Sequence, residues 1–188
     1  MKLSRIKALC KETGKAIIYT DTAPDGMVLQ QYISNGTVIV PVEGLPILQA
    51  SNLPTLFQLS PAAEEKMTLK DAPLPEGIPV QDMGAWEEAM VPMHLRLKIG
   101  RHTLIPLRQE IGRVIYLDAD LSGAIEAKEP RYILRKIGTK PVVAIMDGFF
   151  LAGIVAPATM PEDSEDDLLA MANAVRIAQA EEPEEETA

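Results

Sequence analysis

Apolar residues recur at helical spacing near the start of the chain and then alternate with polar residues up to residue 44. The first spacing predicts an amphipathic helix over residues 4–13, which begins at Ser4 and ends at Gly14. Lysines lie on its polar face, and its apolar face consists of Leu3, Ile6, Leu9 and Cys10. Because Cys10 belongs to the apolar face, we expect a buried and inert thiol.

Three short β-rich runs follow this helix, over residues 15–20, 27–34 and 37–42. The dipeptides Asp25-Gly26 and Asn35-Gly36 separate them, and both favour tight hairpin turns. Short strands joined by such turns predict an antiparallel meander rather than a parallel sheet.

Proline then interrupts the pattern, with seven prolines between residues 45 and 92. Short helices are predicted at 53–59 and 61–67, and a helical turn around Trp86 within 84–90. We interpret residues 45–92 as a long connection packed over the core. Within it, the apolar segment 53–60 either supplies core side chains, which is the simpler interpretation, or serves as a docking peptide.

Alternation returns over residues 93–157. Strands are predicted at 93–99, 103–107 and 113–117, and then at 132–137, 142–146 and 149–156, with a tight turn at Asp147-Gly148. Between these groups we expect a short helix over 118–125, capped by Asp118 or Asp120.

The last segment of the chain carries its net charge. Residues 162–186 contain ten of the 27 acidic residues and one of the 18 basic residues, so the net charge of −9 lies there and the rest is neutral. Apolar residues at helical spacing predict a helix over 163–180. The predicted organisation is one α+β domain over 1–160, an acidic helical segment over 161–180 and a disordered tail over 181–188.

Composition narrows the class of protein. A single cysteine forms no internal disulfide, the N-terminus lacks the apolar run of a signal peptide, and no stretch approaches the ~20 apolar residues that span a bilayer. We therefore expect a cytoplasmic protein without membrane contact.

A helix followed by three strands occurs twice, over 4–42 and about 118–157, and each last hairpin runs into an apolar strand that ends at proline. This repeated pattern can result from a duplication or from chance recurrence in a small α+β domain. The segments KPVVAIMDGFFLAGIVAPATM (140–160) and YISNGTVIVPV (32–42) resemble the last hairpins of the repeats of DNA sliding clamps. The resemblance implies two αβββ repeats with helices on one face, and a ring would require a homo-oligomer. The long 45–92 connection and Gly123 in the second helix depart from the pattern.

The sequence offers little support for catalysis. His94 and His102 are the only histidines and have no zinc-type spacing. Asp118 and Asp120 form a DxD pair that could bind a divalent ion, although helix capping is the simpler interpretation. No nucleophile elbow and no glycine-rich phosphate loop is present. We therefore predict a protein that is not an enzyme and needs no cofactor.

Basic residues outside the acidic segment suggest that the protein binds an anionic partner rather than catalysing a reaction. Residues 94–140 hold ten basic and five acidic residues, and the first helix adds lysines. Solvated faces that keep the protein soluble are one interpretation. The other is a sequence-independent surface for duplex DNA backbone, for which the candidate residues are Lys7, Lys11, Lys15, Arg131, Arg135 and Lys136. The predicted function is DNA-clamp-like binding or scaffolding; the alternative is a small protein–protein interaction module, which would use the C-terminal helix and never contact nucleic acid.

Overall fold

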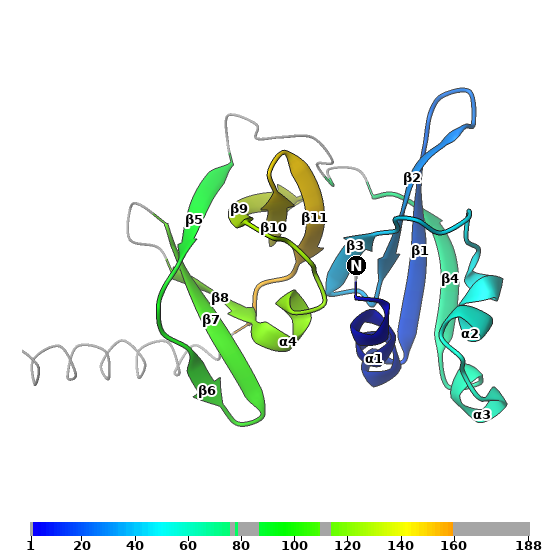
Figure 1. Ribbon diagram of the computed structural model, residues 1–188, viewed down its shortest axis with the longest axis horizontal. Helices are drawn as coiled ribbons and strands as arrows, with labels where there is room; N and C mark the ends of the chain where they lie inside the picture. The colour runs from blue at the N-terminus through cyan, green and yellow to red at the C-terminus, as the bar shows by residue number, and fades with distance from the viewer. Residues whose placement is uncertain (1, 76–77, 79–86, 110–113, 160–188) are drawn as a thin grey trace, which may run out of the picture. The chain divides into compact units, whose positions relative to one another are not determined.

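A mixed α+β fold, dominated by one large sheet, forms in the computed structural model, which describes residues 2–75, 78, 87–109 and 114–159 (Figure 1). Within these residues the sheet has eleven strands. Ten of them follow the order β4-β1-β2-β3-β11-β10-β9-β5-β7-β6, and the eleventh, β8, pairs with β7. The chain divides into two compact units, residues 1–158 and residues 159–188, and every element below belongs to the first. The predicted helix over 163–180 and the tail over 181–188 lie outside the described residues.

The first helix, α1 (Leu3–Thr13), ends where the sequence predicts but begins earlier. Gly14 adopts a positive φ of 64° and its N–H reaches the carbonyl groups of the last turn, so it closes the helix as expected. The N-cap is Lys2 and not Ser4, because the apolar face starts at Leu3 and packs on the core.

A three-stranded antiparallel meander follows α1, as predicted. It consists of β1 (Lys15–Thr22), β2 (Val28–Ser34) and β3 (Val38–Pro41). At the second turn the Asn35 side-chain carbonyl accepts hydrogen bonds from the backbone N–H groups of Thr37 and Val38, at 3.0 and 2.9 Å. The glycine that follows Asn35 has a positive φ of 99°, which explains the Asn-Gly dipeptide.

The proline-rich connection contains short helices and also two strands that the sequence analysis missed. The helices are η1 (Ala50–Asn52), α2 (Leu53–Leu56) and α3 (Pro61–Glu64), and Leu53 and Phe57 are fully buried, as expected of a core segment. The missed strands are β4 (Thr68–Pro73) and β5 (Glu88–Pro92). β4 runs parallel to β1, so the prediction of a purely antiparallel sheet is wrong there. β5 also replaces the end of the helical turn predicted at 84–90.

A second group of strands begins with β6 (Leu97–Ile99), β7 (His102–Gln109) and β8 (Val114–Asp118). The short helix α4 (Ala119–Ser122) follows directly, within the predicted range. A second meander then consists of β9 (Pro130–Ile137), β10 (Lys140–Asp147) and β11 (Phe150–Val155). β11 pairs antiparallel with β3, so the two meanders meet edge to edge.

The two faces of the sheet bury different side chains. α1, α2 and the residues after α4 cover one face, whose core includes Ile6, Phe57, Ile125 and Val143. The other face holds a smaller cluster around Tyr32, Ile133, Ala144 and Met146, to which Ile78 contributes from the segment after β4. Strand β10 is apolar on both sides because both of its faces are covered.

Candidate nucleic-acid interface

Cations surround the half of α1 that does not pack on the sheet. Ile6, Leu9 and Cys10 are buried, whereas Arg5 and Lys11 are exposed and Lys7 is half-buried. The exposed N-cap residue Lys2 extends this basic surface by one position. A lysine or arginine can keep its charged end in water while its alkyl stem covers apolar surface, which suits these positions.

α4 lies beside the first turn of α1 (Figure 1). The Lys2 N–H points to the carbonyl of Ala124, just after α4, at 3.5 Å. Arg5 packs over Gly123 so closely that a Cβ added at this glycine would lie 2.3 Å from Arg5 Nη1. Gly123, which departs from the clamp pattern, therefore leaves room for Arg5 of the neighbouring helix α1.

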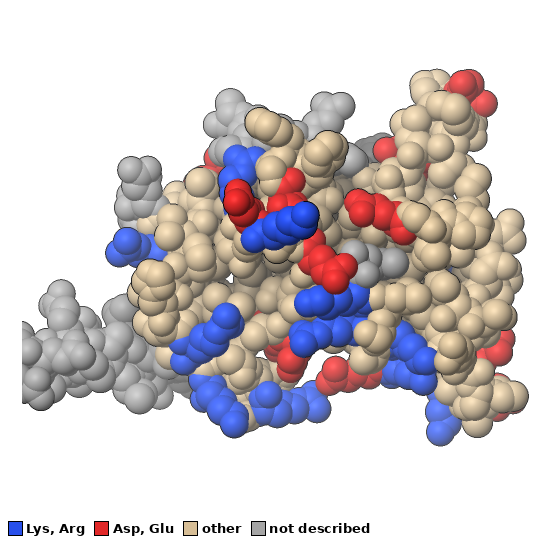
Figure 2. Space-filling model, viewed as in Figure 1, with Lys and Arg blue, Asp and Glu red and all other residues tan. Residues whose placement is uncertain are grey.

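The β6–β7 hairpin brings further cations near α1. Lys98 and Arg101 are exposed on it, and Arg101 Nη2 lies 3.6 Å from the Glu12 carboxylate at the end of α1. Figure 2 shows lysine and arginine side chains over α1 and the β6–β7 hairpin on this face. We call the surface made by Lys2, Arg5, Lys7, Lys11, Lys98 and Arg101 the basic face.

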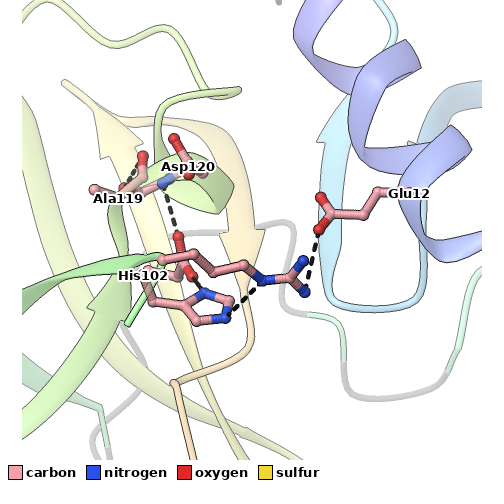
Figure 3. A network of polar contacts seen from close by, with 7 residues as sticks. Glu12, His102, Ala119 and Asp120 are labelled. Carbon is pink, nitrogen blue, oxygen red and sulfur yellow. Dashed lines mark hydrogen bonds and ion pairs between the residues drawn. The ribbon is translucent and has the colours of Figure 1, made fainter. Parts of the chain in front are cut away.

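A polar network anchors the hairpin to α4 (Figure 3). His102 Nδ1 lies 2.6 Å from Asp118 Oδ2, and the other Asp118 oxygen accepts the backbone N–H of Asp120 at 2.8 Å. Arg101 Nε donates to His102 Nε2 at 3.4 Å, so His102 Nδ1 holds the proton that is shared with Asp118. Of the two predicted caps of α4, Asp118 is the one that forms, and it is also the partner of His102.

This network borders a cavity of about 350 Å³ between α1, the β2–β3 turn, the β6–β7 hairpin and α4. Its polar lining includes the charged residues Glu12, Arg101, Asp118 and Asp120, and His102. Within the described residues, no group of three His, Cys, Asp or Glu side chains is placed to hold a metal ion. Asp118 and Asp120 instead meet at the cap of α4, where Asp118 also contacts the histidine.

The six residues predicted from sequence do not form one surface. Lys7 and Lys11 lie on α1, and the exposed Lys15 follows at the start of β1. Arg131 and Lys136 are exposed on β9, in the other meander. Arg131 lies on the sheet face opposite α1, because it alternates with Tyr132, which packs against the helix-covered core.

Arg135 is a correction to the predicted site. It is 1 % exposed, and its Nε lies 2.6 Å from a carboxylate oxygen of the buried Glu87. A phosphate group cannot reach this guanidinium, and its charge serves an internal ion pair.

Sequence reasoning missed the contribution of the β6–β7 hairpin. It places Lys98 and Arg101 only within a basic stretch, and it treats His102 as an ordinary strand histidine. The partner of His102 lies 16 positions away on a strand that pairs with its own, and no local pattern marks that contact. Arg5 stands two positions before Lys7 on α1, so helical spacing places it on another side of the helix, and only its contact with Gly123 shows where it lies.

The helices of the described residues are short, and the chain was compared with known proteins. No helix in the described part of the chain has the length and apolar character needed to cross a membrane. Comparison with protein-family models, with curated proteins and with solved structures finds no match to this chain.

Proposed function

We propose that this chain is a non-enzymatic binding protein whose basic face contacts the phosphate backbone of duplex DNA, in the manner of a clamp-like domain. The observation that carries the proposal is the position of α1 and α4. Each helix precedes a three-stranded meander, the two helices touch, and cations from α1 gather around them.

The strand order supports two αβββ units. Counted outward from the β3–β11 pair, the strands are β3, β2 and β1 on one side and β11, β10 and β9 on the other. In both meanders the last strand lies at the pair and the first strand lies farthest from it. Because β3 and β11 are antiparallel, a two-fold rotation about this pair would exchange the two meanders. The same rotation would exchange α1 and α4. The contact between the two helices agrees with this, because helices related by such an axis would lie next to each other.

The charge distribution supports an anionic partner. The basic face has six cations, and the carboxylate that Arg101 contacts, at 3.6 Å, belongs to the exposed Glu12. Exposed ion pairs of this kind contribute little, so the arginine can exchange such a partner for phosphate. Backbone contacts of this type carry no sequence information and weaken steeply with salt.

The test is fluorescence anisotropy of a labelled random-sequence duplex over a range of salt concentrations. The variant Lys7→Glu/Lys11→Glu should weaken binding and reduce the slope of log K against log salt by about 0.9 for each phosphate that the protein no longer neutralises. The matched control Lys136→Glu/Lys140→Glu changes the same charge at exposed positions around the β9–β10 turn and should bind more tightly than the test variant. Equal affinity of the two variants, or an absence of binding by the unaltered protein at low salt, would refute the proposal.

The alternative function, a protein-interaction module, is favoured by one observation. Phe149 and Phe150 are 78 % and 80 % exposed, and exposed adjacent aromatic residues are typical of contact sites between proteins. This surface is distinct from the basic face, so a module of this kind would bind its partner without any contact with nucleic acid.

A further inference from the structure

A hollow of about 230 Å³ lies beside α4, on the sheet face that α1 also covers. The deep part of its lining consists of the buried Ile125 and Ile145, and the half-buried Tyr132 lies next to them. The exposed Arg96, which directly precedes β6, also lines it. Among the described residues of this lining none is acidic, so the hollow presents a positive charge.

Two side chains of the hollow can donate hydrogen bonds to an anion. Burial raises the pKa of Tyr132, and the positive charge of Arg96 opposes this rise. The Tyr132 hydroxyl therefore keeps its proton at neutral pH and lies within range of the Arg96 charge. Within the residues that the structure describes, no acidic side chain pairs with Arg96. The Ser122 hydroxyl also lines the hollow, but it already donates to the Ala119 carbonyl at 3.3 Å.

A guanidinium and a hydroxyl are donors that suit a phosphate group. Arginine presents its N–H groups in a planar fork that bonds two oxygens of a phosphate at once, and tyrosine hydroxyls also contact phosphates of nucleic acids. The volume of the hollow is several times the ~30 Å³ that one water molecule occupies in the liquid, so a phosphate and part of its hydration shell have room. The polar opening of the hollow agrees with an anion that stays partly hydrated.

The hollow continues the basic face across α4. Gly123 lines the hollow, and the guanidinium of Arg5 lies against the same glycine. Guanidinium groups from α1 and from the segment before β6 therefore both lie close to α4. A single carboxylate would occupy only one of these positions, whereas the phosphates of a nucleic-acid strand repeat along it and can reach both.

We propose that the hollow beside α4 holds one phosphate group, bound by the Arg96 guanidinium and the Tyr132 hydroxyl. In the complex with duplex DNA this group is a backbone phosphate next to those on α1, and that part of the inference rests on the proposed function. The site itself requires only a phosphate with accessible oxygens, so a free phosphate ion occupies it as well.

An NMR titration of the isotope-labelled full chain with sodium phosphate tests the site, with sodium chloride at equal ionic strength as the reference. The backbone amide signals of Arg96, Gly123 and Tyr132 should shift and saturate with phosphate alone. Arg96→Gln should abolish this saturable shift. Tyr132→Phe keeps the ring and should weaken phosphate binding about tenfold, the effect of one hydrogen bond to a charged group.

The matched control is Arg108→Gln. It removes the same charge from an exposed position on β7, on the sheet face opposite to Ile105, which lines the hollow. This variant should bind phosphate as the unaltered protein does, and the NMR spectra show whether each variant is folded. Absence of a saturable shift in the unaltered protein, or an undiminished shift in Arg96→Gln, would overturn the site.

Anisotropy of a labelled duplex tests the source of the phosphate. Arg96→Gln should reduce the slope of log K against log salt by about 0.9, the value for one phosphate, and Arg108→Gln should leave the slope unchanged. A saturable phosphate shift with an unchanged DNA slope in Arg96→Gln would support the site for a free phosphate-bearing ligand and overturn its assignment to DNA. If the unaltered protein binds no DNA, the proposed function fails, and the phosphate titration alone decides the hollow.

Discussion

The pair Arg135 and Glu87 places two opposite charges inside the protein. Both side chains are almost completely excluded from water, at 0 % and 1 % exposure, and their closest atoms lie 2.6 Å apart. Taking two charges out of water costs several kcal/mol each, and their mutual attraction offsets this cost only while both are present. Glu87 directly precedes β5, which pairs with β9, the strand of Arg135. The pair therefore fixes β5 against the sheet.

We expect Glu87→Ala to destabilise the protein by about 3–5 kcal/mol, because it leaves the Arg135 charge buried without this partner. Urea unfolding measures the change. Glu88→Ala is the matched control, since Glu88 is the exposed neighbour, and it should cost no more than about 0.5 kcal/mol. The double variant Glu87→Leu/Arg135→Met should lose less stability than Glu87→Ala alone; a larger loss would contradict this account.

Cys10 also shows how burial controls the chemistry of a residue. Burial raises the pKa of the Cys10 thiol from its ordinary value of 9.0 to about 12, so the native protein holds a neutral thiol at physiological pH. We expect a thiol reagent to modify Cys10 only after unfolding, which a spectrophotometric thiol assay with and without denaturant would measure. Rapid modification of the native protein at neutral pH would show that the helix does not protect it.

The same shift predicts alkaline sensitivity. Between pH 9 and about 12 the unfolded thiol has lost its proton whereas the folded thiol retains it, so the unfolded state binds fewer protons and stability falls as pH rises. Above pH 9 the contribution of Cys10 approaches a loss of about 1.4 kcal/mol per pH unit. Tyr32, with a pKa raised to about 12 by burial and by Asp21, adds a further loss above pH 10. Cys10→Ala should flatten the slope of stability between pH 9 and 10, measured by urea unfolding.

At the scale of elements, the strands that the sequence did not reveal are those that depend on distant partners. β4 has exposed residues at most positions and one proline, so it lacks the alternation that marks a half-buried strand. It forms because β1 offers a free edge, and because the Asp71 carboxylate accepts the Ala50 N–H at 2.9 Å and connects it to η1. β5 is likewise defined by β7 and β9 on its two sides.

The helix α4 depends on its cap, because one turn of helix has little stability of its own. Asp118→Ala removes both the cap and the His102 contact and should cost about 1–2 kcal/mol. Asp118→Asn keeps an oxygen for the Asp120 N–H and should cost less. Asp120→Ala is the control with its cap intact and should change stability little. Chemical denaturation gives all three values, and an Asp120 effect as large as that of Asp118→Ala would contradict the assigned roles.

At the scale of the whole molecule, the charge of the last segment opposes the proposed DNA contact. Residues 162–186 carry the entire net charge of −9, and the rest of the chain is neutral. Deletion of residues 162–188 should therefore increase the affinity for duplex DNA at low salt, because it removes like-charge repulsion. The difference should shrink as salt is added and screens the charges. Anisotropy titrations of the two chains measure this; equal affinities at low salt would contradict the prediction.

Local pattern by itself determined the α+β class, the end of α1, both meanders, their Asn-Gly and Asp-Gly turns and the burial of Cys10. It also narrowed the cap of α4 to Asp118 or Asp120. These features follow from interactions over a few residues, through periodicity, backbone conformation and hydrogen bonds that the sequence displays directly. Tertiary structure decided which charges share a surface. It placed Arg135 inside the protein, separated Arg131 from Lys7, and brought Arg101 and His102 to α1 and α4. Such contacts depend on how strands pair across long separations, which no short stretch of sequence records.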